Sequence, residues 1–217
     1  MFIVGVDTSA NTMNWAMAEL LANPQEMKKV QQELEAVVGM ERMVNDDDLE
    51  KLTYLRAIIK ETFRLHPVAS MMIPHMSKEA CEIEVLGADL DGTDKTYNYQ
   101  IQAGTMVFIN LWAIGRDEHV WKQPDQFKPG RFVDSAIDLK GQHFELLPFG
   151  SGRRMCPGLN LALPIVDVTL ANLVHAFDDW NLVLPPGQSS LDMSDECGIV
   201  CRRVQPLVVV PTKNPIV

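Results

Sequence analysis

Residues 159–177 form a long apolar stretch that restricts the fold of this chain more than any other feature. The stretch is hydrophobic on more than one helical face, so as a helix it must be buried among other elements. Pro164 lies inside it and removes one backbone hydrogen-bond donor, which predicts a kink. The sequence therefore predicts a buried helix near the C-terminal end of the chain.

Three further helices and a small sheet are predicted before this stretch. The helical segments are residues 1–23, 24–38 and 49–66, which end at Pro24, Gly39 and Pro67. Short alternating runs between residues 81 and 109, separated by glycines, predict a small antiparallel sheet. Residues 116–158 predict a long loop, and residues 206–210 predict a last strand. The predicted class is mainly α with a small antiparallel β-sheet (α+β), in one domain over residues 1–217.

Composition and charge exclude several classes of protein. The 217 residues include 19 basic and 29 acidic side chains, and the net charge of −10 argues against a nucleic-acid partner. No run of about 18 predominantly apolar residues predicts a transmembrane segment. The four cysteines include no C-x-x-C pair, so we expect the thiols to stay reduced. Cys197 and Cys201 can face each other across a turn, but we interpret that spacing as incidental.

A loop rich in glycine and arginine, directly before the buried helix, carries the strongest chemical signal. No Lys-Ser or Lys-Thr follows Gly150-Ser151-Gly152, so a phosphate-binding loop is a weak interpretation. Cys156 stands instead beside two arginines at the positive end of the helix, and both features favour a thiolate. Such a thiolate can be a nucleophile or a metal ligand; the alternative is a small packed hydrophobic residue. The glycines, which let backbone approach a flat ligand, and Arg154, which can pair with a carboxylate, favour haem.

The same loop resembles the haem-binding signature of the cytochrome P450 family, in the pattern Phe149-x-x-Gly152-x-Arg154-x-Cys156-x-Gly158. Four more segments are similar to motifs of that family, in the family's order. They are Gly5-Val6-Asp7-Thr8-Ser9 (the oxygen-activation motif of the I helix), Glu61-Thr62-Phe63-Arg64 (E-x-x-R of the K helix), residues 110–117 (similar to plant microsomal members) and Phe127-Lys128-Pro129-Gly130-Arg131-Phe132 (the P-E-R-F segment). The resemblance implies the C-terminal half of the family fold, from the I helix (residues 1–23) through the K helix (residues 49–66) to the L helix (residues 159–177).

The resemblance also implies a role for each residue of the signature. Cys156 is the expected axial thiolate ligand of the iron in haem b (iron protoporphyrin IX). Arg154 is expected to bind a haem propionate, and Gly152 and Gly158 to allow close backbone approach. Phe149 is expected to shield the sulfur and to tune the reduction potential of the haem.

Three other positions receive expectations with an open alternative. Asp7 and Thr8 match the motif that relays protons to bound dioxygen, and the alternative is a solvated Asp-Thr pair. His75 stands where plant members commonly have an arginine that reaches a propionate, so this anchor is expected to be weaker or pH-dependent. A solvated loop histidine is the alternative for His75, and the remaining histidines are interpreted as structural.

Glu61 and Arg64 share a helix face, and on most helices such a pair is a surface interaction. The resemblance instead implies that both form a buried ion-pair triad with Arg131, which holds the loop that carries Cys156. Gly130 occupies the position of the family's usual glutamate, and we expect this change to be tolerated.

The function implied is that of a haem-thiolate monooxygenase. It would hydroxylate a lipophilic small molecule, a plant secondary metabolite, with O2 and electrons from an NADPH-dependent reductase. Arg153, Lys122 and Lys128 are candidates for a basic docking face. The alternatives are a truncated, catalytically incompetent fragment, a haem-thiolate isomerase or dehydratase, and a haem sensor that uses Cys156-Pro157. The full-length family member is expected in the endoplasmic reticulum membrane, with its anchor upstream of these residues, and this chain alone in the cytoplasm or at a membrane periphery.

Overall fold

Two separate units make up the structure, a computed structural model that describes residues 2–88 and 94–213. The larger unit contains Met1–Ser70 and Leu111–Val217, and the smaller unit contains Met71–Asn110. This division into two units does not test the prediction that residues 1–217 form one domain, which stays a prediction.

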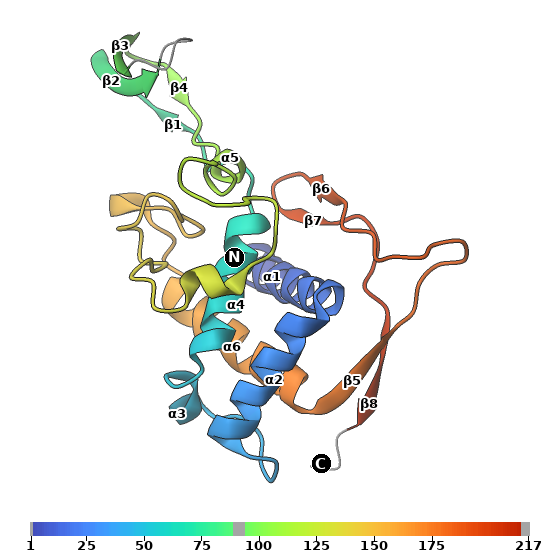
Figure 1. Cartoon of the computed structure of the whole chain (residues 1–217). Coiled ribbons are helices and arrows are strands. Elements are labelled where there is room, and N and C mark those ends of the chain that lie inside the picture. Colours follow the sequence, from blue (N-terminus) through green and yellow to red (C-terminus); the bar gives the residue numbers. More distant parts are fainter. Residues whose placement is uncertain (1, 89–93, 214–217) are drawn as a thin grey trace. The chain divides into compact units, whose positions relative to one another are not determined.

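Four long helices form the core of the larger unit (Figure 1). They are α1 (Phe2–Ala22), α2 (Pro24–Val38), α4 (Thr53–Leu65) and α6 (Leu159–His175), and α6 contacts the other three. Leu170 and Ala171 of α6 are fully buried, as the apolar pattern predicts, and Pro164 lies within the helix. Its first half differs, because Leu161 and Ile165 are 70% and 43% exposed. An apolar surface therefore follows Cys156 on this helix.

The helix predicted over residues 49–66 begins only at Thr53, and Leu49 is the last residue of a separate short helix. Asn45 caps α3 (Asp46–Leu49) through a capping box with Asp48, so the acidic residues complete a short helix of their own. Leu52 then has non-helical backbone angles (φ −82°, ψ 71°), and α4 begins at Thr53. Asn45 was a sequence signal for the start of α3.

The smaller unit contains two short antiparallel pairs rather than one sheet. Strand β2 (Cys81–Ala88) pairs with β3 (Asp94–Ile101), with Cys81 opposite Ile101. Strand β1 (His75–Met76) pairs with β4 (Met106–Val107). The antiparallel pairing is as predicted, but the third predicted run pairs with residues around His75 instead of extending the first two.

The loop predicted over residues 116–158 is present in the larger unit, with few regular elements. It follows α5 (Leu111–Ile114) and contains the 3-10 helices η1 (Pro129–Phe132) and η2 (Gly152–Arg154). After α6, strand β5 (Phe177–Leu182) pairs with β8 (Val209–Lys213), three residues beyond the start of the predicted last strand.

A hairpin of β6 (Asp195–Cys197) and β7 (Cys201–Arg203) corrects the expectation about the cysteines. Cys197 and Cys201 form a disulfide, whereas Cys81 and Cys156 are free. The pair lies directly opposite in the hairpin, and this register brings the two sulfur atoms together. The expectation that all thiols stay reduced was wrong, because spacing alone does not reveal strand register.

Candidate cofactor site

A tight loop before α6 presents the sulfur of Cys156 to solvent. The backbone N–H of Cys156 donates to the carbonyl of Phe149 at 2.8 Å, which closes the loop. Within it, the N–H of Met155 donates to the carbonyl of Gly152 at 3.1 Å. The loop ends at Gly158, which caps α6. The thiol is therefore free, exposed and two residues before a helix N-terminus.

Glycines give this loop its shape. Gly150 and Gly152 have φ values of +72° and +69°, a region that side chains other than glycine rarely occupy. A Cβ at Gly141 would lie 2.7 Å from the carbonyl oxygen of Gly150, so the neighbouring chain also requires a glycine. A Cβ at Gly158 would lie 3.6 Å from the sulfur of Cys156, which places this glycine beside the thiol. The open backbone around the sulfur suits a flat ligand.

An aromatic contact joins the loop to α4. The ring of Phe149 meets the ring of Phe63 edge to face, with the centroids 5.3 Å apart. Phe63 is 5% exposed, so its own position is fixed by the core. The residue expected to shield the sulfur is thus held by the helix that carries Glu61 and Arg64.

The three residues of the expected ion-pair triad lie together in the structure. Glu61 and Arg64 form two hydrogen bonds, of 2.8 Å from Nε and 2.9 Å from Nη2, with both side chains fully buried. Arg131 of η1 donates from Nε to Oε1 of Glu61 at 3.1 Å. The same oxygen accepts the backbone N–H of Lys128 at 2.7 Å. Glu61 thus joins α4 to η1 in the long loop.

Arg64 and Arg131 also donate hydrogen bonds to backbone carbonyls of the loop. Arg64 donates to the carbonyls of Gly115 at 2.5 Å, Pro124 at 2.6 Å and Gln126 at 3.1 Å. Arg131 donates to the carbonyl of Lys122 at 3.0 Å. Carbonyl groups of a loop without regular structure need donors from elsewhere, and the guanidinium fork supplies several from one side chain. A loop with little secondary structure is therefore fixed by side chains.

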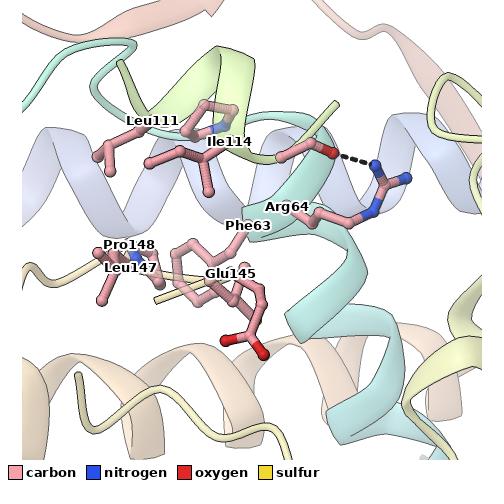
Figure 2. A pocket seen from close by; sticks show the side chains of 10 residues that line it. Phe63, Arg64, Leu111, Ile114, Glu145, Leu147 and Pro148 are labelled. Atoms are coloured by element: carbon pink, nitrogen blue, oxygen red, sulfur yellow. Dashed lines mark hydrogen bonds between the residues drawn. The ribbon is translucent and has the colours of Figure 1, made fainter. Parts of the chain in front are cut away.

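A small pocket lies beside Arg64. Figure 2 shows the hydrogen bond that Arg64 donates to the carbonyl of Gly115. The pocket volume of about 10 Å³ has room for no more than about one water molecule. The lining residues that Figure 2 labels are Phe63, Arg64, Leu111, Ile114, Glu145, Leu147 and Pro148. The pocket belongs to the packing around α4 and has no room for an organic substrate.

Asp7 and Thr8 lie on α1, which packs against α6. Asp7 is exposed and Thr8 is half-buried. Their backbone carbonyls accept side-chain hydrogen bonds from Asn11 at 2.7 Å and Thr12 at 2.9 Å. The expected proton-relay residues thus share the larger unit with Cys156.

His75 belongs to the smaller unit. It is exposed on β1 and lies opposite Val107. Because His75 and Cys156 belong to different units, the expected role of His75 stays a prediction.

One buried polar cluster was not predicted from the sequence. Nε2 of His66 lies 2.6 Å from Oε1 of Glu19, and the His66 ring stacks on Trp15 with centroids 3.8 Å apart. Asn23 donates to the other oxygen of Glu19 at 3.1 Å. His66 was interpreted as structural, and its contacts agree; its partner Glu19 shares the apolar face of α1 and gave no separate signal.

The exposed side chain of Arg154 has no hydrogen-bond or ion-pair partner among the residues that the structure describes. A haem needs a thiolate for its iron, a cation for its carboxylates and open backbone beside its ring. The free thiol of Cys156, the unpartnered Arg154 and the glycines of the loop supply these groups. The residues present therefore fit a haem.

Comparison with known proteins identifies the family. A family model described as Cytochrome P450 matches residues 1–209. The chain belongs to the cytochrome P450 family. It is 45% identical to an iridoid oxidase of Catharanthus roseus, over 99% of this chain and 39% of that protein. It is 41% identical to a flavonoid 3'-monooxygenase of Petunia hybrida, over 97% of this chain and 39% of that protein. The chain spans about two fifths of the length of these cytochrome P450 relatives.

Solved structures identify the fold as part of the cytochrome P450 fold. A zebrafish cytochrome P450 in a structure with abiraterone matches with a TM-score of 0.79 and 29% identity, over 99% of this chain and 45% of that chain. The predicted family and fold class are confirmed, and family membership implies a haem cofactor. None of the described helices combines the length and the apolar character that a membrane span requires.

Proposed function

We propose that this chain is the haem-binding part of a cytochrome P450 monooxygenase, which inserts oxygen into a lipophilic small molecule. The exposed free thiol of Cys156, on a glycine loop tied to α4, carries this proposal. Three relatives support the class of reaction and substrate by their names: iridoid oxidase, flavonoid 3'-monooxygenase and geraniol 8-hydroxylase of Swertia mussotii. The chain is 42% identical to the geraniol 8-hydroxylase, over 98% of this chain and 40% of that protein. We propose a plant secondary metabolite as substrate.

The cofactor in this proposal is haem b, which supplies the chemistry of dioxygen activation when bound. Cys156 would provide a thiolate ligand to the iron, and Arg154 would pair with a propionate carboxylate. Gly152 and Gly158 would let the backbone approach the ring plane, while Phe149 would exclude water from the sulfur. The edge-to-face contact of Phe149 with Phe63 supports this role, since a ring held by the core keeps its position.

Asp7 and Thr8 are the proposed proton-handling residues. An exposed carboxylate can take protons from solvent, and a neighbouring half-buried hydroxyl can hold one toward the interior. This gradient of exposure along one turn of α1 supports a relay from solvent inward.

The proposed electron donor is an NADPH-dependent reductase. Arg153 and Lys122 are exposed and Lys128 is half-buried, so these side chains can form a basic patch on an acidic protein. For the full-length protein we propose the endoplasmic reticulum membrane.

Haem reconstitution of the 217-residue chain tests the proposal. The reduced carbon monoxide difference spectrum should show a strongly red-shifted Soret band that Cys156→Ala removes. Cys81→Ala is the matched control, because Cys81 is also free and exposed but lies in the smaller unit. No band would favour a catalytically incompetent fragment. A band with turnover that needs no reductase would favour an isomerase or dehydratase, and a band that survives Glu61→Ala and Arg131→Ala would favour a haem sensor.

A further inference from the structure

The disulfide of the β6–β7 hairpin involves none of the residues proposed to bind haem, and its two sulfur atoms are unequally exposed. Cys197 is exposed, whereas Cys201 is 4% exposed. Ile199, at the turn between them, is 95% exposed, so solvent reaches the bond from the turn. A thiol in solution can therefore approach the sulfur of Cys197 more easily than that of Cys201.

The two strands of the hairpin are also held unequally. The backbone N–H of Cys201 donates to the carbonyl of Val68 at 2.7 Å. Arg203, 8% exposed, donates to the carbonyl of Asp192 at 2.7 Å and lies over the ring of Trp15 in α1, 5.3 Å from the centroid. Strand β7 is therefore anchored, while every residue of β6 is exposed.

We propose that Cys197–Cys201 is a thiol–disulfide exchange site that takes a small dithiol reductant. One thiolate of the dithiol attacks the sulfur of Cys197, a mixed disulfide forms, and Cys201 leaves as a thiolate that takes up a proton. The second thiol of the dithiol then displaces Cys197 and closes its own disulfide. Two electrons and two protons pass to the protein, which ends with two cysteine thiols.

Opening the bond removes the covalent link between an anchored strand and an exposed strand. Strand β7 keeps its bonds to Val68 and Asp192, while among the described residues β6 keeps the ladder, the exposed ion pair Arg202–Glu196 at 3.6 Å and the charge interaction of Asp195 with Arg116. Exposed pairs contribute little to stability. The redox state of this site thus controls the mobility of β6 without releasing β7.

Differential labelling of the full chain tests whether the site exchanges. The native chain, purified without reductant, is treated with a light maleimide, then with dithiothreitol, then with a heavy maleimide. Cys81 and Cys156 should carry the light label, and Cys197 and Cys201 the heavy label, with Cys197 labelled before Cys201. Light label on all four cysteines would overturn the proposal, and so would a bond that dithiothreitol opens only after the chain unfolds.

The charge beside Cys197 provides a test of which sulfur is attacked. Oδ2 of Asp195 lies 3.8 Å from the sulfur of Cys197 and should repel an anionic thiol. Asp195→Asn should speed reduction by mercaptoethanesulfonate relative to the uncharged mercaptoethanol, and Asp47→Asn, a distant exposed carboxylate on α3, should not. An unchanged ratio of the two rates would show that Cys197 is not the sulfur attacked.

Hydrogen exchange tests the effect on the hairpin. Reduction should speed exchange at the amides of residues 195–198 and leave the amide of Cys201 unchanged, because its bond to Val68 remains. Unchanged exchange in β6, or equal acceleration in both strands, would contradict the proposed control.

Discussion

Oε1 of Glu61 accepts the Nε–H of Arg131 at 3.1 Å and the backbone N–H of Lys128 at 2.7 Å. The carboxylate is fully buried, and its other oxygen binds Arg64 at 2.8 Å. The buried carboxylate accepts four hydrogen bonds from three residues and compensates two buried or partly buried guanidinium groups, so its removal leaves their charge without a partner.

Glu61→Ala should therefore destabilise the fold by about 3–5 kcal/mol, the usual cost of breaking one partner out of a buried ion pair. We expect the same change, and Arg64→Ala, to abolish haem incorporation, because we propose that the triad holds the long loop that leads to Cys156. Urea unfolding and the haem absorbance of the reconstituted chain measure the two effects. Glu118→Ala, which removes an exposed glutamate, is the control; full haem content in Glu61→Ala would refute this role of the triad.

The Asp48 carboxylate should make the fold sensitive to acid. Arg42 donates two hydrogen bonds to it, at 2.6 and 2.9 Å, and these, with the backbone N–H of Asn45, lower the pKa of Asp48 to about 2. Since the folded pKa lies below the unfolded value of about 4, the stabilisation is present above pH 4 and is lost as the pH falls toward 2.

Asp48→Asn should accordingly lower the urea midpoint at pH 7, and the difference from the parent chain should close between pH 4 and pH 2. Asp47→Asn, an exposed neighbour, should leave the midpoint unchanged. A constant difference between parent and Asp48→Asn down to pH 2 would contradict the lowered pKa.

Asp167 on α6 should make the fold less stable as the pH rises, the opposite of the effect of Asp48. Burial raises its pKa to about 6, and the charge of Arg56 offsets this only in part. The protonated form is favoured in the fold, so stability is full below about pH 4 and decreases as the pH rises toward 6. Asp167→Asn should be more stable than the parent at pH 7, by at most about 3 kcal/mol, and equal to it at pH 4. Thermal unfolding at both pH values measures this; equal melting temperatures at pH 7 would argue against it.

Gly115 should not tolerate a side chain. A Cβ there would lie 2.3 Å from the carbonyl oxygen of Arg64, so the end of α4 would have to move. Gly115→Ala should cost about 1–3 kcal/mol, as overpacking usually does. Gly130→Ala is the matched control, because no atom lies within 4 Å of a Cβ at Gly130, and its unfolding midpoint should match the parent's. Equal midpoints for both variants would contradict the close approach.

The fold could be predicted from the sequence where the signals were local. The burial of Leu170 and Ala171 followed from the apolar pattern, and Pro24 and Gly39 bound α2 as predicted. The start of the helix predicted over residues 49–66 was wrong, because Leu49 ends the separate helix α3, which Asn45 caps, and non-helical backbone at Leu52 delays the start of α4 to Thr53. The pairing of β1 with β4 could not be predicted, since strands of two residues carry almost no periodicity.

For the candidate site, too, some features could be predicted from the sequence and others could not. The order of motifs identified the family and the residues around Cys156, but no spacing in the sequence showed that Phe63 holds Phe149. The disulfide of Cys197 and Cys201 was missed, because it depends on strand register in a hairpin.

The sequence by itself determined which residue types stand in the Cys156 loop, where α2 and α6 begin, and the family, because these depend on neighbours along the chain. Only the tertiary structure decided that Glu61 accepts the backbone N–H of Lys128, that Glu19 meets His66, and which cysteines pair. These contacts join segments through burial and register, and a buried charge is stable only where the fold brings it a partner.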